Sequence, residues 1–143
     1  SMSNHDYQSG FHLAHALKSW FRKTKDIKVD CGVSHRKYYR YGNNMLGFEH
    51  GDGANINRLP LLMAQEEPKM WSATKYRYWY LHHIHHKWLD AKDFIGTTVE
   101  YLRSPSGADS WHSRKGFVGI SKAVEGFIHE KQGGQVARLV HYF

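Results

Sequence analysis

The segment KYRYWYLHHIHH, residues 75–86, joins a run of aromatic and aliphatic side chains to four closely spaced histidines. Aromatic residues fill consecutive positions from Tyr78 to Tyr80, so they occupy both faces of an extended chain, as is typical of a strand buried on both sides. We therefore expect a central β-strand over 75–81. Neutral histidine has one lone-pair nitrogen per ring, so the cluster after this strand is a candidate source of metal ligands.

Composition limits the class of protein. The 143 residues, 41% of them hydrophobic, are enough for one core, and we expect a single domain over residues 2–143. Cys31 is the only cysteine, which excludes an intrachain disulfide and favours a cytoplasmic location. No run of about 18 apolar residues occurs, so we expect a soluble protein with no membrane partner. The formal net charge of +7 favours a polyanionic partner such as nucleic acid.

Periodicity and turn residues predict the other elements, and the outcome is an α/β fold of the mixed α+β kind. Apolar residues at helical spacing predict helices over 9–23 and 55–66, the second with Pro60 in its first turn. Turn residues at 42–44 and 132–134 predict two hairpins, formed by 36–41 with 45–50 and by 122–129 with 136–142. Further strands are expected over 27–31 and 95–102, with a polar loop over 104–115.

Histidine follows two of the predicted strands. His50 precedes the turn Gly51-Asp52-Gly53, and the cluster at 82–86 follows the central strand. Sites in mixed sheets gather at the carboxyl ends of strands, where loops converge. His83 and His85 share one face of an extended segment, which suits one metal ion or two adjacent ions. An ordinary solvated or hydrogen-bonded histidine pair is the alternative interpretation.

Three motifs in order resemble those of a known superfamily. Ser3-Asn4-His5-Asp6, then His50 in FEHGDG, then His83-Ile84-His85, resemble the second half of the motif series of the calcineurin-like metallophosphoesterases. These proteins carry Gly-Asn-His-Asp/Glu, a later isolated His and Gly-His-x-His. The phage and prophage branch, often described as DNA repair exonucleases, is most similar, because LPLLMA and SGADSWHSRKGFVG also resemble it. The resemblance covers nearly the whole chain.

The resemblance implies a fold and an activity. It implies the C-terminal part of the family's β-sandwich, flanked by helices, beginning at the Asn-His-Asp motif. The implied activity is that of a hydrolase, a metal-dependent phosphodiesterase or nuclease acting on DNA or on another phosphoester. Two alternatives stay open: a non-catalytic basic domain that binds nucleic acid, and an inactive remnant of a split prophage gene.

Metal ligands can be carried over position by position. Asn4, His50 and His83 match ligands of one ion, and His85 matches a ligand of the other. Imidazoles and an amide oxygen leave a divalent ion with residual positive charge, able to lower the pKa of bound water. Manganese is the ion expected, with zinc, iron and nickel as alternatives.

Catalytic and substrate-binding candidates lie on both sides of these ligands. His5 matches the histidine that contacts the phosphate and assists the leaving group, and Asp6 can orient it through a hydrogen bond. Asp52 either bonds its own turn or orients His50. The polar loop contains Trp111, His112 and Arg114, which are candidates for substrate contact, or for pinning the loop to the core.

The chain departs from the family pattern at its start. Family members carry Asp-x-His and Gly-Asp motifs ahead of Asn-His-Asp, and these supply aspartate ligands, including the one that bridges the metals. Only Ser1 and Met2 precede Ser3. We therefore expect at most one ion of the family's two here, with an N-terminal partner chain or a dimer mate completing the site. Ser3 and His82 stand where the family has glycine, which predicts altered backbone geometry there.

Overall fold

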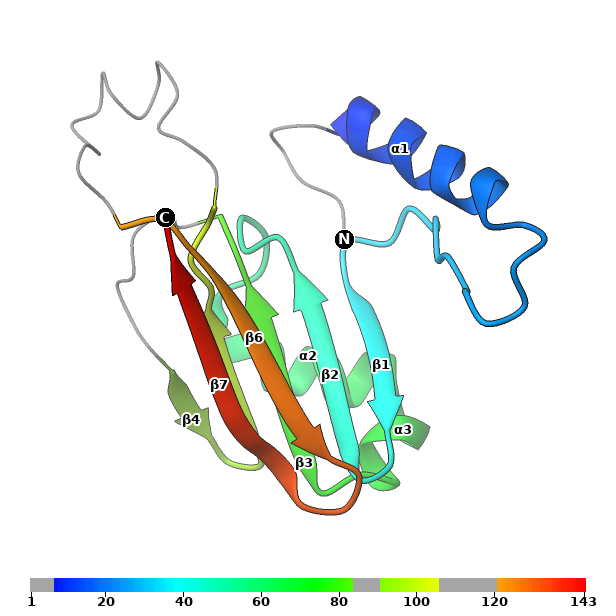
Figure 1. The fold of residues 1–143 in the computed structure, drawn as a ribbon. Helices are drawn as coiled ribbons and strands as arrows, with labels where there is room; N and C mark the ends of the chain where they lie inside the picture. Colours follow the sequence, from blue (N-terminus) through cyan, green and yellow to red (C-terminus); the bar gives the residue numbers. More distant parts are fainter. Residues whose placement is uncertain (1–6, 84–90, 106–120) are drawn as a thin grey trace.

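The computed structural model describes residues 7–83, 91–105 and 121–143 (Figure 1). In this part of the chain a mixed five-stranded sheet has the order β1-β2-β3-β5-β4, and β6 and β7 form a two-stranded sheet. None of the helices there has the length and apolar character needed to cross a membrane. The elements are α1 (Tyr7–Trp20), β1 (Lys37–Tyr41), β2 (Asn44–Glu49), η1 (Ile56–Arg58), α2 (Leu59–Glu66), α3 (Pro68–Ser72), β3 (Tyr76–Leu81), β4 (Lys92–Phe94), β5 (Thr97–Tyr101), β6 (Ala123–Glu130) and β7 (Gly134–Tyr142).

Strand β3 is the centre of the five-stranded sheet and is covered on both faces. It pairs in parallel with β2 on one side and with β5 on the other. On one face, Trp79 is fully buried and donates its indole N–H to the Leu59 carbonyl of α2 at 3.1 Å. On the other face, Tyr80 packs against Phe127 of β6, with ring centroids 4.5 Å apart. The predicted central strand is therefore confirmed, with α2 and α3 behind it and the β6-β7 hairpin in front (Figure 1).

Polar contacts bind the β6-β7 hairpin to the sheet. Arg138 of β7 lies 3.3 Å from the Glu100 carboxylate of β5, and it also contacts Glu125 of β6. The Tyr80 hydroxyl lies 2.9 Å from both His129 Nε2 and Gln135 Oε1. Two β-layers with helices on the outer face of one of them form a mixed α+β fold, as the sequence predicts.

Burial of His129 links this layer to pH. Burial lowers the pKa of His129 below the ordinary value of 6.5, so the folded state favours the neutral ring. The unfolded chain binds more protons just below that pH, and we expect the free energy of unfolding to rise with pH up to about 6.5. When the free energy of unfolding is measured with urea at several pH values, its increase with pH should be smaller for His129→Gln than for the unsubstituted chain. The exposed His141→Gln is the control, and equal slopes in both variants would contradict the assignment.

Glycines close both predicted hairpins. Gly42, with φ 56°, lies in the turn between β1 and β2, and Gly134, with φ 85°, begins β7. Both are in the left-handed region that glycine adopts most readily. The helix predicted over 55–66 begins as η1 and continues as α2, with a proline in the first turn of α2. These three predictions are confirmed, with shifts of at most two residues at their ends.

Other predictions were wrong. The strand expected over 27–31 does not form: Asp30 instead accepts a hydrogen bond from the Gly32 backbone N–H at 2.9 Å and one from Lys37 Nζ at 2.9 Å. Such local side-chain bonds compete with strand pairing. The helix predicted over 9–23 does form, as α1, but none of its residues is buried and Trp20 is 78% exposed. Strand β4 and helix α3 were missed because three and five residues are too few to show a period.

Candidate functional site

His50 and His83 meet at the carboxyl ends of two neighbouring strands. Because β2 and β3 are parallel, with Glu49 opposite Leu81, the segments that follow them leave the sheet at the same edge. The His82 N–H donates to the His50 carbonyl at 3.1 Å and joins the two segments. His83 Nδ1 lies 3.3 Å from His50 Nε2, and the ring centroids are 5.1 Å apart. The structure thus brings two sequence-predicted site residues together.

The spacing of these two nitrogens fits two ligands of one ion. Nitrogens bound to a tetrahedral ion at about 2.0–2.1 Å lie about 3.3 Å from each other. The observed distance of 3.3 Å between the two nitrogens matches this value, and it also suits a long hydrogen bond between the rings. Within the described residues, no group of three or more His, Cys, Asp or Glu side chains is placed to hold a metal ion. The role of His50 and His83 as ligands stays a prediction.

The backbone of His83 is left-handed. Its φ is 61°, the only positive value at a non-glycine residue within the described ranges. This conformation costs an ordinary residue roughly 1–2 kcal/mol. The sequence predicts the unusual backbone at His82, which stands where the family has glycine; the structure places it one residue later. Strain of this kind concentrates at functional sites, and here it sets the ring that faces His50.

A pair of substitutions tests this backbone assignment. We expect His83→Gly to be more stable to urea than His83→Ala by about 1 kcal/mol, because both lose the imidazole and only glycine relaxes in the left-handed region. The same two substitutions at His82, whose φ is not positive, should give the opposite order. Equal stabilities at position 83 would contradict the left-handed assignment.

The two glycines of the turn Gly51-Asp52-Gly53 allow its backbone to lie close to neighbouring residues. A Cβ on Gly51, which has φ 102°, would lie 3.0 Å from the His82 carbonyl oxygen. A Cβ on Gly53 would lie 2.5 Å from Glu49 Oε1. Each glycine therefore permits a close approach that a side chain would block. Asp52, between them, is exposed and lines the cleft described below.

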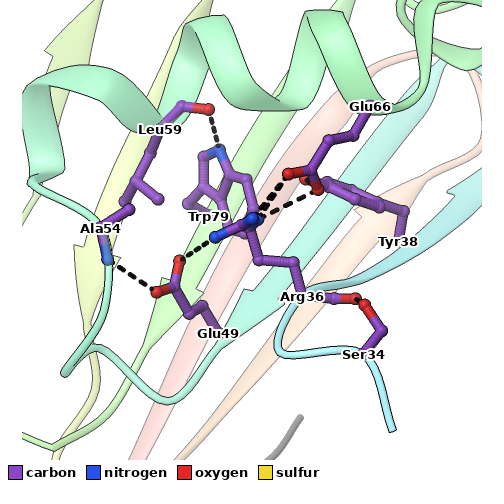
Figure 2. A network of polar contacts seen from close by, with 8 residues as sticks. All are labelled: Ser34, Arg36, Tyr38, Glu49, Ala54, Leu59, Glu66 and Trp79. Carbon is purple, nitrogen blue, oxygen red and sulfur yellow. Dashed lines mark hydrogen bonds and ion pairs between the residues drawn. The ribbon is translucent and has the colours of Figure 1, made fainter. Parts of the chain in front are cut away.

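Glu49, next to His50, anchors a polar network on the helix-covered side of the sheet (Figure 2). Glu49 is 3% exposed, and its Oε1 accepts a hydrogen bond from the Ala54 N–H at 3.0 Å. Arg36 Nη1 lies 4.0 Å from Glu49 Oε2, while Arg36 Nε donates to both oxygens of Glu66 at 2.8 and 3.0 Å. Hydrogen bonding by Arg36, joined by the Tyr38 hydroxyl, holds the pKa of Glu66 below its usual range.

This network forms one wall of a surface cleft of about 390 Å³. The cleft was not predicted from the sequence. The one available signal is Glu49 itself, a charged residue two positions after Gly47 on the buried face of β2. The residues that line the cleft are His35, Arg36, Glu49, Asp52, Gly53, Ala54, Arg58 and Leu62.

The remaining sequence-predicted site residues lie outside the described ranges. They are Asn4, His5, Asp6, His85, Trp111, His112 and Arg114. No protein-family model, curated protein or solved structure matches this chain.

Proposed function

We propose that this chain supplies the C-terminal portion of a metal-dependent phosphodiesterase that acts on nucleic acid. The observation that carries the proposal is the His50–His83 pair, whose ring nitrogens lie 3.3 Å apart where parallel strands β2 and β3 end. The order of the motifs around Asn4, His50 and His83 supports it, because it resembles the metallophosphoesterase series. On this proposal the sheet and the β6-β7 hairpin are part of the family's β-sandwich.

The proposed roles follow from the chemistry of the side chains. His50 and His83 would hold a divalent ion, manganese in the first instance, through neutral ring nitrogens, with Asn4 as a further ligand. When bound, such an ion lowers the pKa of water and neutralises a phosphoryl oxygen. His5 would deliver a proton to the leaving oxygen. The left-handed backbone at His83 and the hydrogen bond from His82 to His50 would fix the two rings in advance.

The proposal includes partners. The formal net charge of +7 suits a nucleic-acid substrate, for which DNA is the first choice. Aspartate ligands for a second ion would come from another chain, either an N-terminal partner or a second copy of this chain. A cytoplasmic location belongs to the same proposal.

Hydrolysis assays test the proposal directly. Single-stranded DNA, double-stranded DNA and bis(p-nitrophenyl) phosphate are incubated with the chain and Mn²⁺, and His50→Ala and His83→Ala are compared with His141→Ala. If a second copy of the chain completes the site, we expect metal-dependent cleavage that falls by at least about a hundredfold in the first two variants only. If an N-terminal partner chain is needed, cleavage should appear only on mixing with that partner and should show the same dependence on His50 and His83. Cleavage that survives both substitutions would contradict the proposal. DNA binding that weakens steeply with salt, without cleavage under any metal, would favour the non-catalytic binding domain.

A further inference from the structure

The cleft lined by Arg36 and Glu49 contains a buried carboxylate oxygen that has no hydrogen-bond partner within the described part of the chain. The Glu49 side chain is 4% exposed, and its Oε2 makes no hydrogen bond with any described residue, whereas Oε1 is held by the Ala54 N–H at 3.0 Å. Gly53 allows the turn to approach this carboxylate closely, because a Cβ at position 53 would lie only 2.5 Å from Oε1. A buried acceptor without a hydrogen bond is costly, so a donor from a ligand would stabilise it.

A hydrogen-bond donor lies beside this acceptor. Arg36 Nη1 is 4.0 Å from Glu49 Oε2, too far for a hydrogen bond. Glu66 occupies the other side of the guanidinium, with contacts of 2.8 Å to Nε and 2.7 Å to Nη2 (Figure 2). The edge that faces Glu49 therefore keeps N–H groups available. A complementary ligand group donates to Glu49 and accepts from Arg36.

The lining of the cleft narrows the class of ligand. The positive charges of Arg36 and Arg58 are balanced by the negative charges of Glu49 and Asp52. The inner part of the cleft therefore suits a neutral polar group rather than an ion. Ala54 and Leu62 add apolar walls for a flat ring. Arg58 is exposed and can contact a phosphate at the rim. A volume of about 390 Å³ lies in the lower part of the range for small-ligand pockets.

We propose that this cleft binds an unpaired nucleobase that carries an amino group next to a ring nitrogen, as adenine and cytosine do. The amino N–H would donate to Glu49 Oε2 and the ring nitrogen would accept from Arg36 Nη1, with the phosphate at Arg58. The choice of a nucleotide rests on the proposed function. Because Glu49 directly precedes His50, a strand seated here would run along the same edge of the sheet as the histidine pair.

Calorimetry with two nucleotides tests the subsite. In EDTA, the chain is titrated with adenosine 5′-monophosphate and with purine riboside 5′-monophosphate, which lacks only the amino group. We expect the first to bind about tenfold more tightly. Glu49→Gln keeps the shape but presents an amide N–H in place of the acceptor, so this preference should disappear. Equal binding of the two nucleotides by the unsubstituted chain would overturn the proposal.

Two further variants keep the test decisive. Arg58→Gln, at an exposed position, should weaken the binding of both nucleotides by the same factor and leave the binding of adenosine unchanged. An unchanged affinity for the nucleotides would show that Arg58 is not part of the site. If Glu49→Gln fails to fold, the comparison of nucleotides on the unsubstituted chain and on Arg58→Gln still decides. His50→Ala and His83→Ala should bind both nucleotides normally. Failure of the subsite is thereby separated from failure of the metal site.

Discussion

Replacing Trp79 by alanine is expected to lower the free energy of unfolding by about 3–5 kcal/mol, the largest effect of a single substitution in this chain. Trp79 is fully buried at the centre of the sheet and belongs to the main apolar cluster with Met45, Leu59 and Met63. Alanine would leave a cavity between β3 and α2 and would remove the indole hydrogen bond to the Leu59 carbonyl, which is 3.1 Å long. Close packing around the ring allows little collapse.

Urea unfolding followed by circular dichroism measures this effect. Trp20→Ala is the matched control, because Trp20 lies at the end of α1 and is 78% exposed. It should change the stability by no more than about 0.5 kcal/mol. If the two alanine variants lost similar stability, the arrangement of the core around β3 would be wrong.

Glu125→Ala is expected to cost about 3 kcal/mol, the second largest effect. The side chain of Glu125 is 1% exposed, contacts Arg138 of β7 and accepts a hydrogen bond from the Arg103 N–H at 3.2 Å. Its loss would leave the Arg138 guanidinium partly buried with the Glu100 carboxylate at 3.3 Å as the remaining acid next to it. The cost combines two losses: Arg138 keeps only one of the two carboxylates described next to it, and the Arg103 N–H loses its acceptor.

Chemical denaturation of single and double variants tests this reading of the hairpin. Glu130→Ala removes an exposed carboxylate from the end of the same strand and should have a small effect. The double variant Glu125→Ala, Arg138→Ala should be less destabilised than the sum of its single variants, because both members of the pair are gone. Additive losses would show that the two side chains do not interact.

The parts of the fold that sequence predicts are those encoded by neighbouring residues. The aromatic run before His82 gives β3, and glycines 42 and 134 mark the two hairpins. The meeting of His50 with His83 follows from parallel pairing of the strands that precede them. The strand predicted over 27–31 does not form, because the Asp30 side chain accepts hydrogen bonds from the Gly32 N–H and from Lys37 instead.

The parts that sequence does not predict depend on contacts between distant residues. The position of the Arg36 side chain is set by Glu66, 30 residues later. Without that contact in view, the sequence around Arg36 suggests only a solvated strand face. The Glu49 oxygen that has no hydrogen bond among the described residues, and the cleft beside it, follow from that contact and from the turn at Gly53. The left-handed backbone at His83 is likewise set by its surroundings, since histidine seldom adopts it.

Metal binding by the purified chain tests the central claim most directly. Calorimetric titration with Mn²⁺ and with Zn²⁺ is carried out on the unsubstituted chain and on His50→Ala, His83→Ala and His141→Ala, all shown to be folded by circular dichroism. The His50–His83 site predicts binding that weakens by at least about tenfold in the first two variants and is unchanged in the third. No binding by the folded chain, or binding that survives the loss of both His50 and His83, would contradict it.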